Sequence, residues 1–400
     1  MKKSTVNKII NACPDLPIAK KALSAMRVRL IASHYISEEE VEMGESSSDD
    51  KKAIVNKYRD KPELKETLKM ARRVLDNAPA FKDIENKREI EEDMIFCRLA
   101  YGFQPDEYLC FGLRGKSREE KEAWVSDLDR YIFIHIMNDV KDAQIFNNKA
   151  RTYEVFGEFY GRQAISIKTK EDFPKYKMFI KNHPEFVKKQ VNEGMGRSIE
   201  LVQTESISPK EYFISLIKEG EHILEERIIQ SKVMSKLNES SVNTIRCITV
   251  NTKEGIVIPY TFLKVGRNGS FVDNGGAGGI LAGIDENTGV ISTHGYDEFN
   301  NEYEVHPNTG VRFVGCSFPQ WDEMRSMCID MAKVIPNVKC IGWDMALTDK
   351  GWIVVEGNGM TQFIVPQIVF KRGIKKEVLN LIDKVELITE IPEAIRKRYL

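Results

Sequence analysis

The hydrophobic and polar positions divide the chain into two regions of different pattern. Up to about residue 145, apolar residues recur at three- and four-residue intervals among many Lys and Glu, as in ELKETLKMARRVLDNAP from Glu63. This spacing is typical of amphipathic helices, and Pro79 marks the end of this one. The polar segment GESSSDDKK from Gly44 predicts an exposed loop. This region is therefore predicted to be mainly helical, either as a cap on the rest of the chain or as a part that selects substrate.

From about Phe146 the pattern changes toward strands. FVKKQV from Phe186 is followed by a glycine-containing loop and a second strand, and helical spacing returns in PKEYFISLIKEGEHIL from Pro209. β-Branched and aromatic residues then dominate TIRCITVN, IVIPYTFLKV and SFVDN. Asn268-Gly269 lies between the last two and favours a tight hairpin. Helices followed by a largely antiparallel sheet predict an α+β fold.

The segment IGWDMALTDKGWIVVEGNG, residues 341–359, predicts a β-hairpin. Two apolar-rich strands flank Asp349–Gly351, and its glycine can adopt positive φ without strain. A three-residue turn with glycine in the last place is a common connection. Such a turn pairs Thr348 with Trp352.

Counting outward from that pair places Asp344 opposite Glu356, with Asn358 two residues further on the same face. Opposed like charges destabilise a sheet, so a divalent cation is expected to offset them. Mg²⁺ that shares its shell with nucleotide phosphates fits this oxygen set best, with Mn²⁺ as the alternative. The competing interpretation is a solvated edge hairpin, which the apolar neighbours disfavour because polar groups in buried strands need partners.

Composition and charge limit the function classes. The residues are 42% hydrophobic and 30% charged, which is the composition of a globular protein. A length of 400 residues is more than one ordinary domain. The net charge of −1 gives no overall field that favours nucleic acid or an anionic membrane. The start lacks a signal-peptide pattern, and no stretch approaches the ~20 apolar residues of a membrane helix, so the expected location is the cytoplasm. Seven dispersed cysteines without a CxxC pair suggest neither disulfides nor zinc.

Positive charge for a nucleotide is expected elsewhere in the chain. FVKKQVNEGMGRSI supplies Lys188 or Lys189 on a strand, followed by Gly194 and Gly196, where backbone N–H groups can approach an anion. The segment does not match GxxxxGK[ST], which disfavours a P-loop NTPase. Arg246, among apolar residues in NTIRCITV, is either a paired structural arginine or a fork that binds phosphate or carboxylate.

Taken in order, these segments resemble the ATP-grasp superfamily over residues 147–373. VDNGGAGGI, HPNTG and IGWD make the chain most similar to its sugar-transfer-associated branch. The resemblance implies an ATP-grasp fold, in which two α+β subdomains clamp ATP. Here these would be a lid over residues 146–227 and a metal-binding and catalytic subdomain over 228–400 with a C-terminal helix, after a helical region over 1–145.

The resemblance also implies roles for individual residues. FNNKARTYEVF resembles the entry to the lid and assigns an ATP-phosphate contact to Lys149. FVKKQ assigns a catalytic phosphate contact to Lys188, with Lys189 as the alternative because it stands where many relatives have proline. The other implied residues are nucleotide contacts at Glu225, Glu226 and Ile228 in HILEERIIQ, a catalytic phosphate-facing Arg246, a site residue Asn274, and the magnesium ligands Asp344, Glu356 and Asn358.

The reaction implied by the resemblance is carboxylate–amine ligation through an acyl phosphate. The partners would be small carboxylates and amines, free or sugar-linked, as in cell-surface polysaccharide or sugar-conjugate biosynthesis, and no nucleic acid. Gly342 stands where some ligases carry an arginine, so Arg246 or Arg267 would steady the acyl phosphate. The alternatives are an ATP-dependent small-molecule or sugar kinase of the same fold and a nucleotide-binding protein without catalysis. The set of lysines, arginine and metal ligands that the resemblance implies weighs against the last.

Overall fold

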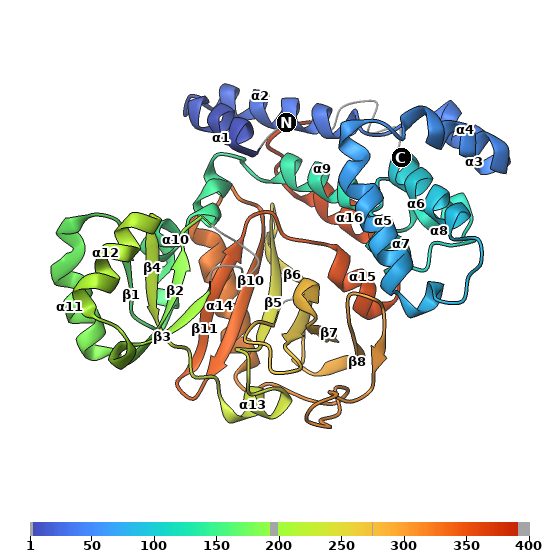
Figure 1. Cartoon of the computed structure of the whole chain (residues 1–400). Coiled ribbons are helices and arrows are strands. Elements are labelled where there is room, and N and C mark those ends of the chain that lie inside the picture. Colours follow the sequence, from blue (N-terminus) through green and yellow to red (C-terminus); the bar gives the residue numbers. More distant parts are fainter. Residues whose placement is uncertain (1–2, 193–198, 274, 391–400) are drawn as a thin grey trace.

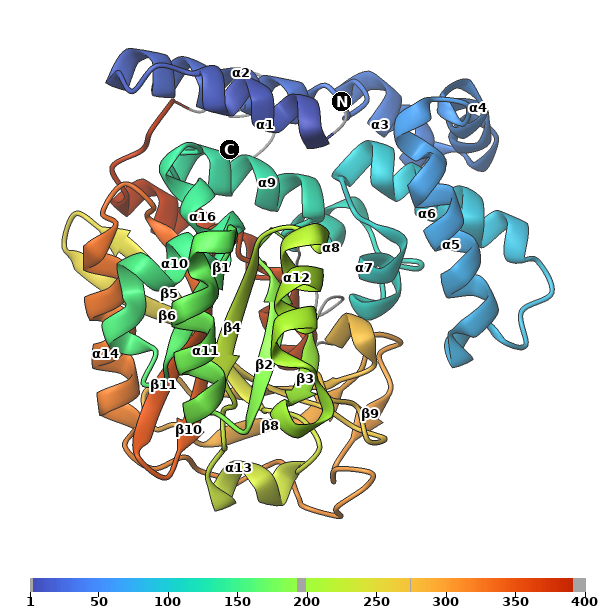
Figure 2. The same ribbon diagram turned by 60° about the vertical axis from the view of Figure 1, so that its left-hand side comes forward.

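The computed structural model describes residues 3–192, 199–273 and 275–390. It has a helical N-terminal region, a four-stranded sheet and a seven-stranded sheet (Figures 1 and 2). Within the described residues, no helix combines the length and apolar character needed to cross a bilayer.

The N-terminal region is helical, as its apolar spacing predicts. Its helices are α1 (Lys3–Ala12), α2 (Pro17–Ala32), α3 (Glu38–Ser46), α4 (Ser48–Tyr58), α5 (Lys65–Asn77), α6 (Lys87–Tyr101), α7 (Pro105–Cys110), α8 (Arg118–Glu122) and α9 (Asp127–Met137).

The loop predicted from Gly44 is wrong, because the segment ends α3 and begins α4. The Ser47 hydroxyl caps α4 by accepting a hydrogen bond from the backbone N–H of Asp50 at 3.3 Å. Gly44 is buried in α3, where an added Cβ would lie 2.2 Å from the ring of Phe96. The polar run is therefore a helix start, and its glycine makes room for an aromatic ring.

The four-stranded sheet has the order β1-β4-β2-β3 and is antiparallel. Apolar residues on one face pack against two helices, and the other face is directed toward the large sheet (Figure 2). The helix α10 (Lys149–Phe156) precedes it. Its elements are β1 (Ala164–Ile167), α11 (Phe173–Asn182), β2 (Glu185–Gln190), β3 (Glu200–Gln203), α12 (Pro209–Glu219) and β4 (His222–Glu226).

The seven-stranded sheet has the order β11-β10-β5-β6-β7-β8-β9 and is also antiparallel. One face packs against α14, and part of the other packs against the N-terminal helices, α15 and α16. Its elements are α13 (Lys232–Leu237), β5 (Thr244–Thr252), β6 (Gly255–Val265), β7 (Ile280–Ile284), β8 (Ile291–Tyr296), β9 (Glu302–Tyr303), α14 (Trp321–Val334), β10 (Cys340–Thr348), β11 (Gly351–Asn358), α15 (Ile364–Phe370) and α16 (Lys375–Lys384).

Two details of the hairpin predictions are wrong. Asn268 and Gly269 form a turn with positive φ (54° and 74°), but residues 270–273, the described part of SFVDN, are not a strand. The β10–β11 turn has two residues instead of three, because Thr348 pairs with Gly351. A β-bulge at Val355 adds one unpaired residue to β11 and so offsets the shorter turn. Asp344 therefore still pairs with Glu356.

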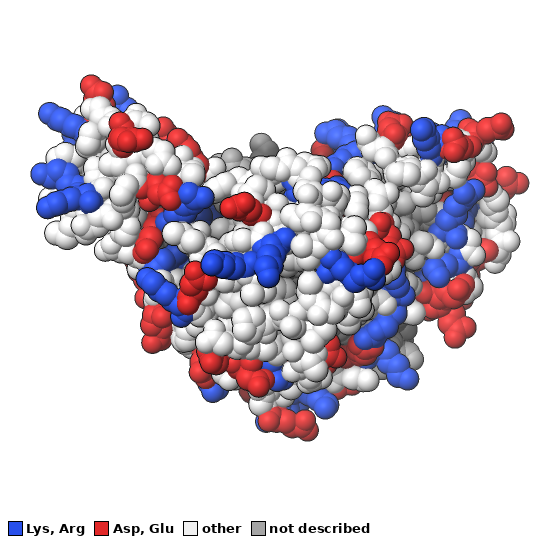
Figure 3. All heavy atoms as spheres, turned by 90° about the horizontal axis from the view of Figure 1, so that it is seen from below, with Lys and Arg blue, Asp and Glu red and all other residues white. Residues whose placement is uncertain are grey.

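The surface seen from below the view of Figure 1 carries both signs of charge (Figure 3). Lys and Arg side chains lie beside Asp and Glu side chains around a broad uncharged area. No field of one sign, of the kind that binds a nucleic-acid backbone, is visible on this face.

Candidate active site

Charged side chains form a row across three neighbouring strands of the large sheet. Glu356 on β11 pairs with Asp344 on β10, and Asp344 pairs with Arg246 on β5. Directly opposed residues share a face of a sheet, so all three side chains point the same way. Arg246 donates two hydrogen bonds to Asp344, from Nε at 2.6 Å and from Nη2 at 2.9 Å.

Lys264 on β6 and Asp273 after it complete this cluster. The Lys264 Nζ donates to Asp344 Oδ2 at 3.0 Å and lies 3.7 Å from Asp273. Thr244 donates to Asp273 from its hydroxyl. The large-sheet cluster, meaning Arg246, Lys264, Asp273, Asp344 and Glu356, thus holds two cations and three carboxylates.

The pKa values of the three carboxylates in this cluster shift in different directions. Burial opposes ionisation of Asp344, which is 1% exposed, but Arg246 and Lys264 outweigh it and hold its pKa well below the usual range. The Glu356 side chain is exposed to the cavity, but protein atoms surround it. The removal of water by these atoms is the largest cause that raises its pKa, and the charge of Asp344 is the next. Burial likewise raises the pKa of Asp273. A further cation near Glu356 would therefore be favoured.

The four-stranded sheet, which lies in the expected lid over residues 146–227, presents a second charged group toward the large sheet. Glu225 on β4 is 3% exposed and accepts hydrogen bonds from Arg162 at 2.8 and 3.0 Å and from Lys189 at 3.0 Å. Burial alone would raise the pKa of Glu225, but Lys189 and Arg162 outweigh it and lower the pKa to about 2. Arg162 also donates to the backbone carbonyls of Val354 and Val355 on β11, which ties the two sheets together.

The two lysines of FVKK lie on opposite faces of β2. Lys189 lines the cavity, whereas Lys188 pairs with Glu200 at 2.7 Å and Glu219 at 3.4 Å beside α12. Successive residues of a strand point to opposite faces of the sheet. Phe186 packs against α11 and α12, so the even-numbered residues of β2, including Lys188, point toward these helices. The structure therefore does not bring Lys188 to the cavity, and the alternative, Lys189, lies there.

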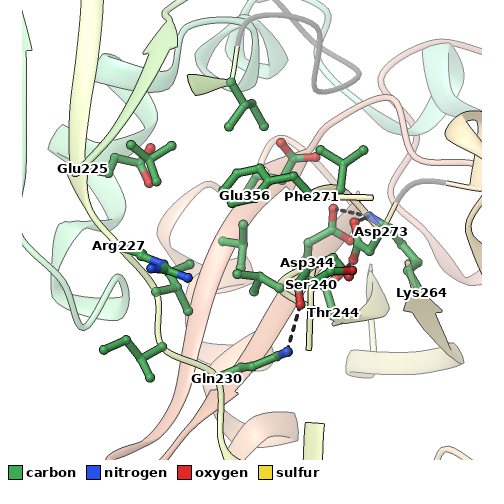
Figure 4. A pocket seen from close by; sticks show the side chains of 18 of the residues that line it. Glu225, Arg227, Gln230, Ser240, Thr244, Lys264, Phe271, Asp273, Asp344 and Glu356 are labelled. Carbon is green, nitrogen blue, oxygen red and sulfur yellow. Dashed lines mark hydrogen bonds and ion pairs between the residues drawn. The ribbon is translucent and has the colours of Figure 1, made fainter. Parts of the chain in front are cut away.

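A cavity of about 280 Å³ lies between the sheets. Figure 4 shows Glu225 on one side and Asp344, Lys264 and Asp273 grouped on the other. Of the residues predicted as nucleotide contacts, those that line the cavity are Lys149, Lys189, Glu225, Glu226 and Ile228.

Lys149 is the first residue of α10, and its Nζ lies 3.4 Å from the Gln190 carbonyl oxygen. Glu226 is held by Gln163, whose backbone carbonyl accepts from the Glu226 N–H at 2.8 Å and whose N–H donates to Oε2 at 3.1 Å. The segment that follows β4 thus begins at a residue held by two hydrogen bonds. Gly194, Gly196 and Asn274 lie outside the described residues.

The two arginines proposed to steady an acyl phosphate are engaged elsewhere. Arg246 binds Asp344 through two nitrogens, and Arg267 binds Asp297 at 3.1 Å and the hydroxyl of Tyr303. Gly342 leaves no space for a side chain, because an added Cβ would lie 2.3 Å from the Thr361 hydroxyl and 3.0 Å from Arg246. The glycine therefore makes room for Thr361 and Arg246.

Sequence reasoning missed Lys264, Asp273 and Arg162. Lys264 is a lone charge in the apolar strand IVIPYTFLKV, the same signal that identified Arg246, and could have been found in the same way. Asp273 adjoins Asn274 in VDNGGAGGI. Arg162 lies in the loop before β1, in YGRQ, and its local sequence carries no signal of a functional role.

The donor set fits a hard divalent cation. No three His, Cys, Asp or Glu side chains converge as a metal cluster in the described part of the chain. The candidate set has two carboxylates and an amide: Asn358 lies beside Glu356, with Nδ2 at 3.3 Å from Oε1. A carboxylate offers about four lone-pair sites, and three on Asp344 are used by Arg246 and Lys264. Glu356 therefore offers the more open oxygens.

Comparison with known proteins gives one family. Residues 129–384, more than half of the chain, match the family described as sugar-transfer-associated ATP-grasp. No curated protein matches the chain.

Several solved structures are similar at low identity. D-alanine–D-alanine ligase from Coxiella burnetii shares 13% identity over 66% of this chain and 62% of that chain, with a TM-score of 0.36. The corresponding ligase from Bacillus anthracis shares 14% over 65% and 71%, with a TM-score of 0.38. The ATP-grasp ligase PsnB, complexed with minimal precursor, Mg and ADP, shares 10% over 64% and 68%, with a TM-score of 0.36. The chain thus spans less than two thirds of the Coxiella ligase.

Proposed function

The chain belongs to the sugar-transfer-associated ATP-grasp family, and on this premise we propose that it uses Mg-ATP to join a carboxylate to an amine. The observation that supports this most directly is that lysines and carboxylates line opposite sides of one cavity. Lys149 and Lys189 line the lid side, and Asp344 and Glu356 line the other. A magnesium nucleotide needs cations for its phosphates and oxygen ligands for its metal, in facing positions.

In this proposal the lysines and the carboxylates have separate tasks. Lys149 and Lys189 hold the phosphates, and Glu356 and Asn358 hold the metal beside Asp344. Mg²⁺ bound there would neutralise charge on the phosphate oxygens. Arg246 and Lys264 fix the orientation of Asp344 through their hydrogen bonds.

The chemistry would run in two transfers. A substrate carboxylate oxygen attacks the γ-phosphorus, the bond to the bridging oxygen of ADP breaks, and an acyl phosphate forms. An amine nitrogen then attacks the acyl carbon, phosphate leaves, and the amine loses a proton. The protein mainly positions the reactants and excludes water, which would otherwise hydrolyse the acyl phosphate.

A kinase of the same fold is the second candidate, and one observation favours it. The two arginines considered for an acyl phosphate are already bound to Asp344 and Asp297. A kinase would release the phosphorylated product and would not need to stabilise it for a second attack.

A product assay separates the two candidates. The protein is incubated with Mg-ATP and a panel of carboxylates, including sugar acids, with and without amines, and ADP, phosphate and organic products are followed. We expect ADP and free phosphate to form together, only when an amine is present. ADP with a stable phosphorylated product and no need for amine would support the kinase instead. Absence of nucleotide binding by the intact chain would overturn both.

A further inference from the structure

The outer face of α2 is apolar and exposed. Ile18 is 85% exposed, Met26 45% and Leu30 48%, and Ala22 between them is also exposed. These residues follow one another at four-residue intervals, so they form one stripe along the helix. Figures 1 and 2 show α2 as the outermost layer of the molecule, beyond α9.

Cations flank this stripe without nearby acidic residues on the helix. Lys21 and Arg29 are exposed on the same face, and neither forms an ion pair with a described residue. The sequence of α2, PIAKKALSAMRVRLIA, holds no Asp or Glu. Residues 1–35 contain seven Lys and Arg but only one acidic residue, Asp15. Residues 36–400 contain the other 52 Lys and Arg and 59 Asp and Glu. The near-zero net charge of the chain therefore hides a strongly basic start.

The fold does not need this outer face, because the inner side anchors the helix. Leu23 and Val28 are buried, and the Lys20 Nζ donates to Asp142 at 2.8 Å. Arg27 donates from Nε to Nε2 of the buried His135 on α9 at 2.6 Å. The exposed stripe is thus held rigidly in place without contributing to the core.

We propose that the outer face of α2 docks the protein on an anionic lipid surface. A helix that presents apolar side chains among Lys and Arg lies in the plane of a membrane, with apolar groups at the headgroup boundary and cations at lipid phosphates. A second copy packed on the same face would bring Lys21 and Arg29 close to like charges, which is unfavourable. The opposite face of the molecule carries mixed charge (Figure 3), so docking would be one-sided. This inference does not depend on the proposed reaction.

Co-sedimentation of the full chain with vesicles tests the proposal. Vesicles of phosphatidylglycerol and phosphatidylcholine are compared with phosphatidylcholine alone, at low and high salt. We expect binding to the anionic vesicles that weakens with salt. The double variant Ile18→Glu/Met26→Glu should lower the partition coefficient by about tenfold or more, and Lys21→Glu/Arg29→Glu should remove the preference for anionic lipid.

A matched control is Met178→Glu, on α11 of the lid, which places a charge at another exposed methionine (67% exposed). It should bind vesicles like the wild type. Three results would overturn the proposal: no binding of wild type to anionic vesicles, an equal loss in Met178→Glu, or a wild-type dimer by light scattering that Ile18→Glu/Met26→Glu dissociates. The last would identify the stripe as a protein interface.

Discussion

The two sheets face the cavity with opposite charge imbalances. In the buried group of the lid, Arg162 and Lys189 both bind the carboxylate of Glu225. In the large-sheet cluster, Arg246 and Lys264 meet three carboxylates, Asp273, Asp344 and Glu356. Among the described residues, this buried group of the lid therefore has a cation in excess and the large-sheet cluster has a carboxylate in excess.

The difference shows why the carboxylates that line the cavity should not all behave alike. Glu225 and Asp344 each sit between two cations, so their pKa values are lowered and they act as structural anchors. No such pair of cations binds Glu356 among the described residues, and burial together with Asp344 raises its pKa. The unpaired carboxylate, rather than the paired ones, should be most sensitive to a bound cation.

The largest effect is expected from Asp344→Asn, which removes the charge shared by Arg246 and Lys264. Arg246 would lose the carboxylate that it binds, and Lys264 would keep only the more distant Asp273 at 3.7 Å. The free energy of unfolding should therefore fall by ~3–5 kcal/mol and nucleotide turnover should be lost. Urea unfolding and an ATP turnover assay measure the two effects. The control Asp349→Asn, in the exposed turn of the same hairpin, should leave both unchanged; an unaltered stability in Asp344→Asn would contradict the anchoring role.

Glu356→Gln should separate activity from stability. It removes the excess carboxylate and relieves repulsion with Asp344, so the free energy of unfolding should stay the same or rise. Turnover should fall by ~10²–10³-fold because a ligand for the metal is weakened. Calorimetry of Mg-ATP binding measures the affinity, and destabilisation as large as that of Asp344→Asn would show that the two carboxylates play the same role.

Acid should weaken the lid through Glu225. Its pKa is about 2 in the folded chain against an ordinary 4.5, so its contribution is complete above pH ~4.5 and is lost as the pH falls toward ~2. The contribution is on the order of 3 kcal/mol. Glu225→Gln should lower the free energy of unfolding at pH 7 and flatten its pH dependence between pH 4.5 and 3, as measured by urea titrations. A variant with the wild-type slope would rule out this linkage.

The smallest effects distinguish the two lysines of β2. Lys189→Ala should weaken ATP binding by ~10–100-fold, as expected for the loss of a hydrogen bond to a charged group. Lys188→Ala is the matched control and should change binding by less than about threefold, because its partners are Glu200 and Glu219 beside α12. Equal losses from both variants, measured by nucleotide titration, would remove the distinction between the two faces.

Much of the fold was predictable because it depends on local patterns. The helical start, the α+β order and the ATP-grasp resemblance are confirmed by the structure and the family match. The Asp344–Glu356 pairing is confirmed as well, although for an incomplete reason. The turn is one residue shorter than assumed, and the unforeseen bulge at Val355 adds one unpaired residue to β11. The two differences cancel, so Asp344 pairs with Glu356 as predicted.

By itself the sequence determined the periodicity of the helices and strands and the hairpin that carries Asp344 and Glu356, because these depend on residues close in the chain. Only the tertiary structure decided which lysine of FVKK faces the cavity, since α11 and α12 choose the covered face of that sheet. It also decided that Lys264 shares Asp344 with Arg246, and that Arg162 bridges Glu225 to β11. These contacts join residues tens to almost two hundred positions apart, and charge complementarity in a buried space selects them only after the sheets have packed.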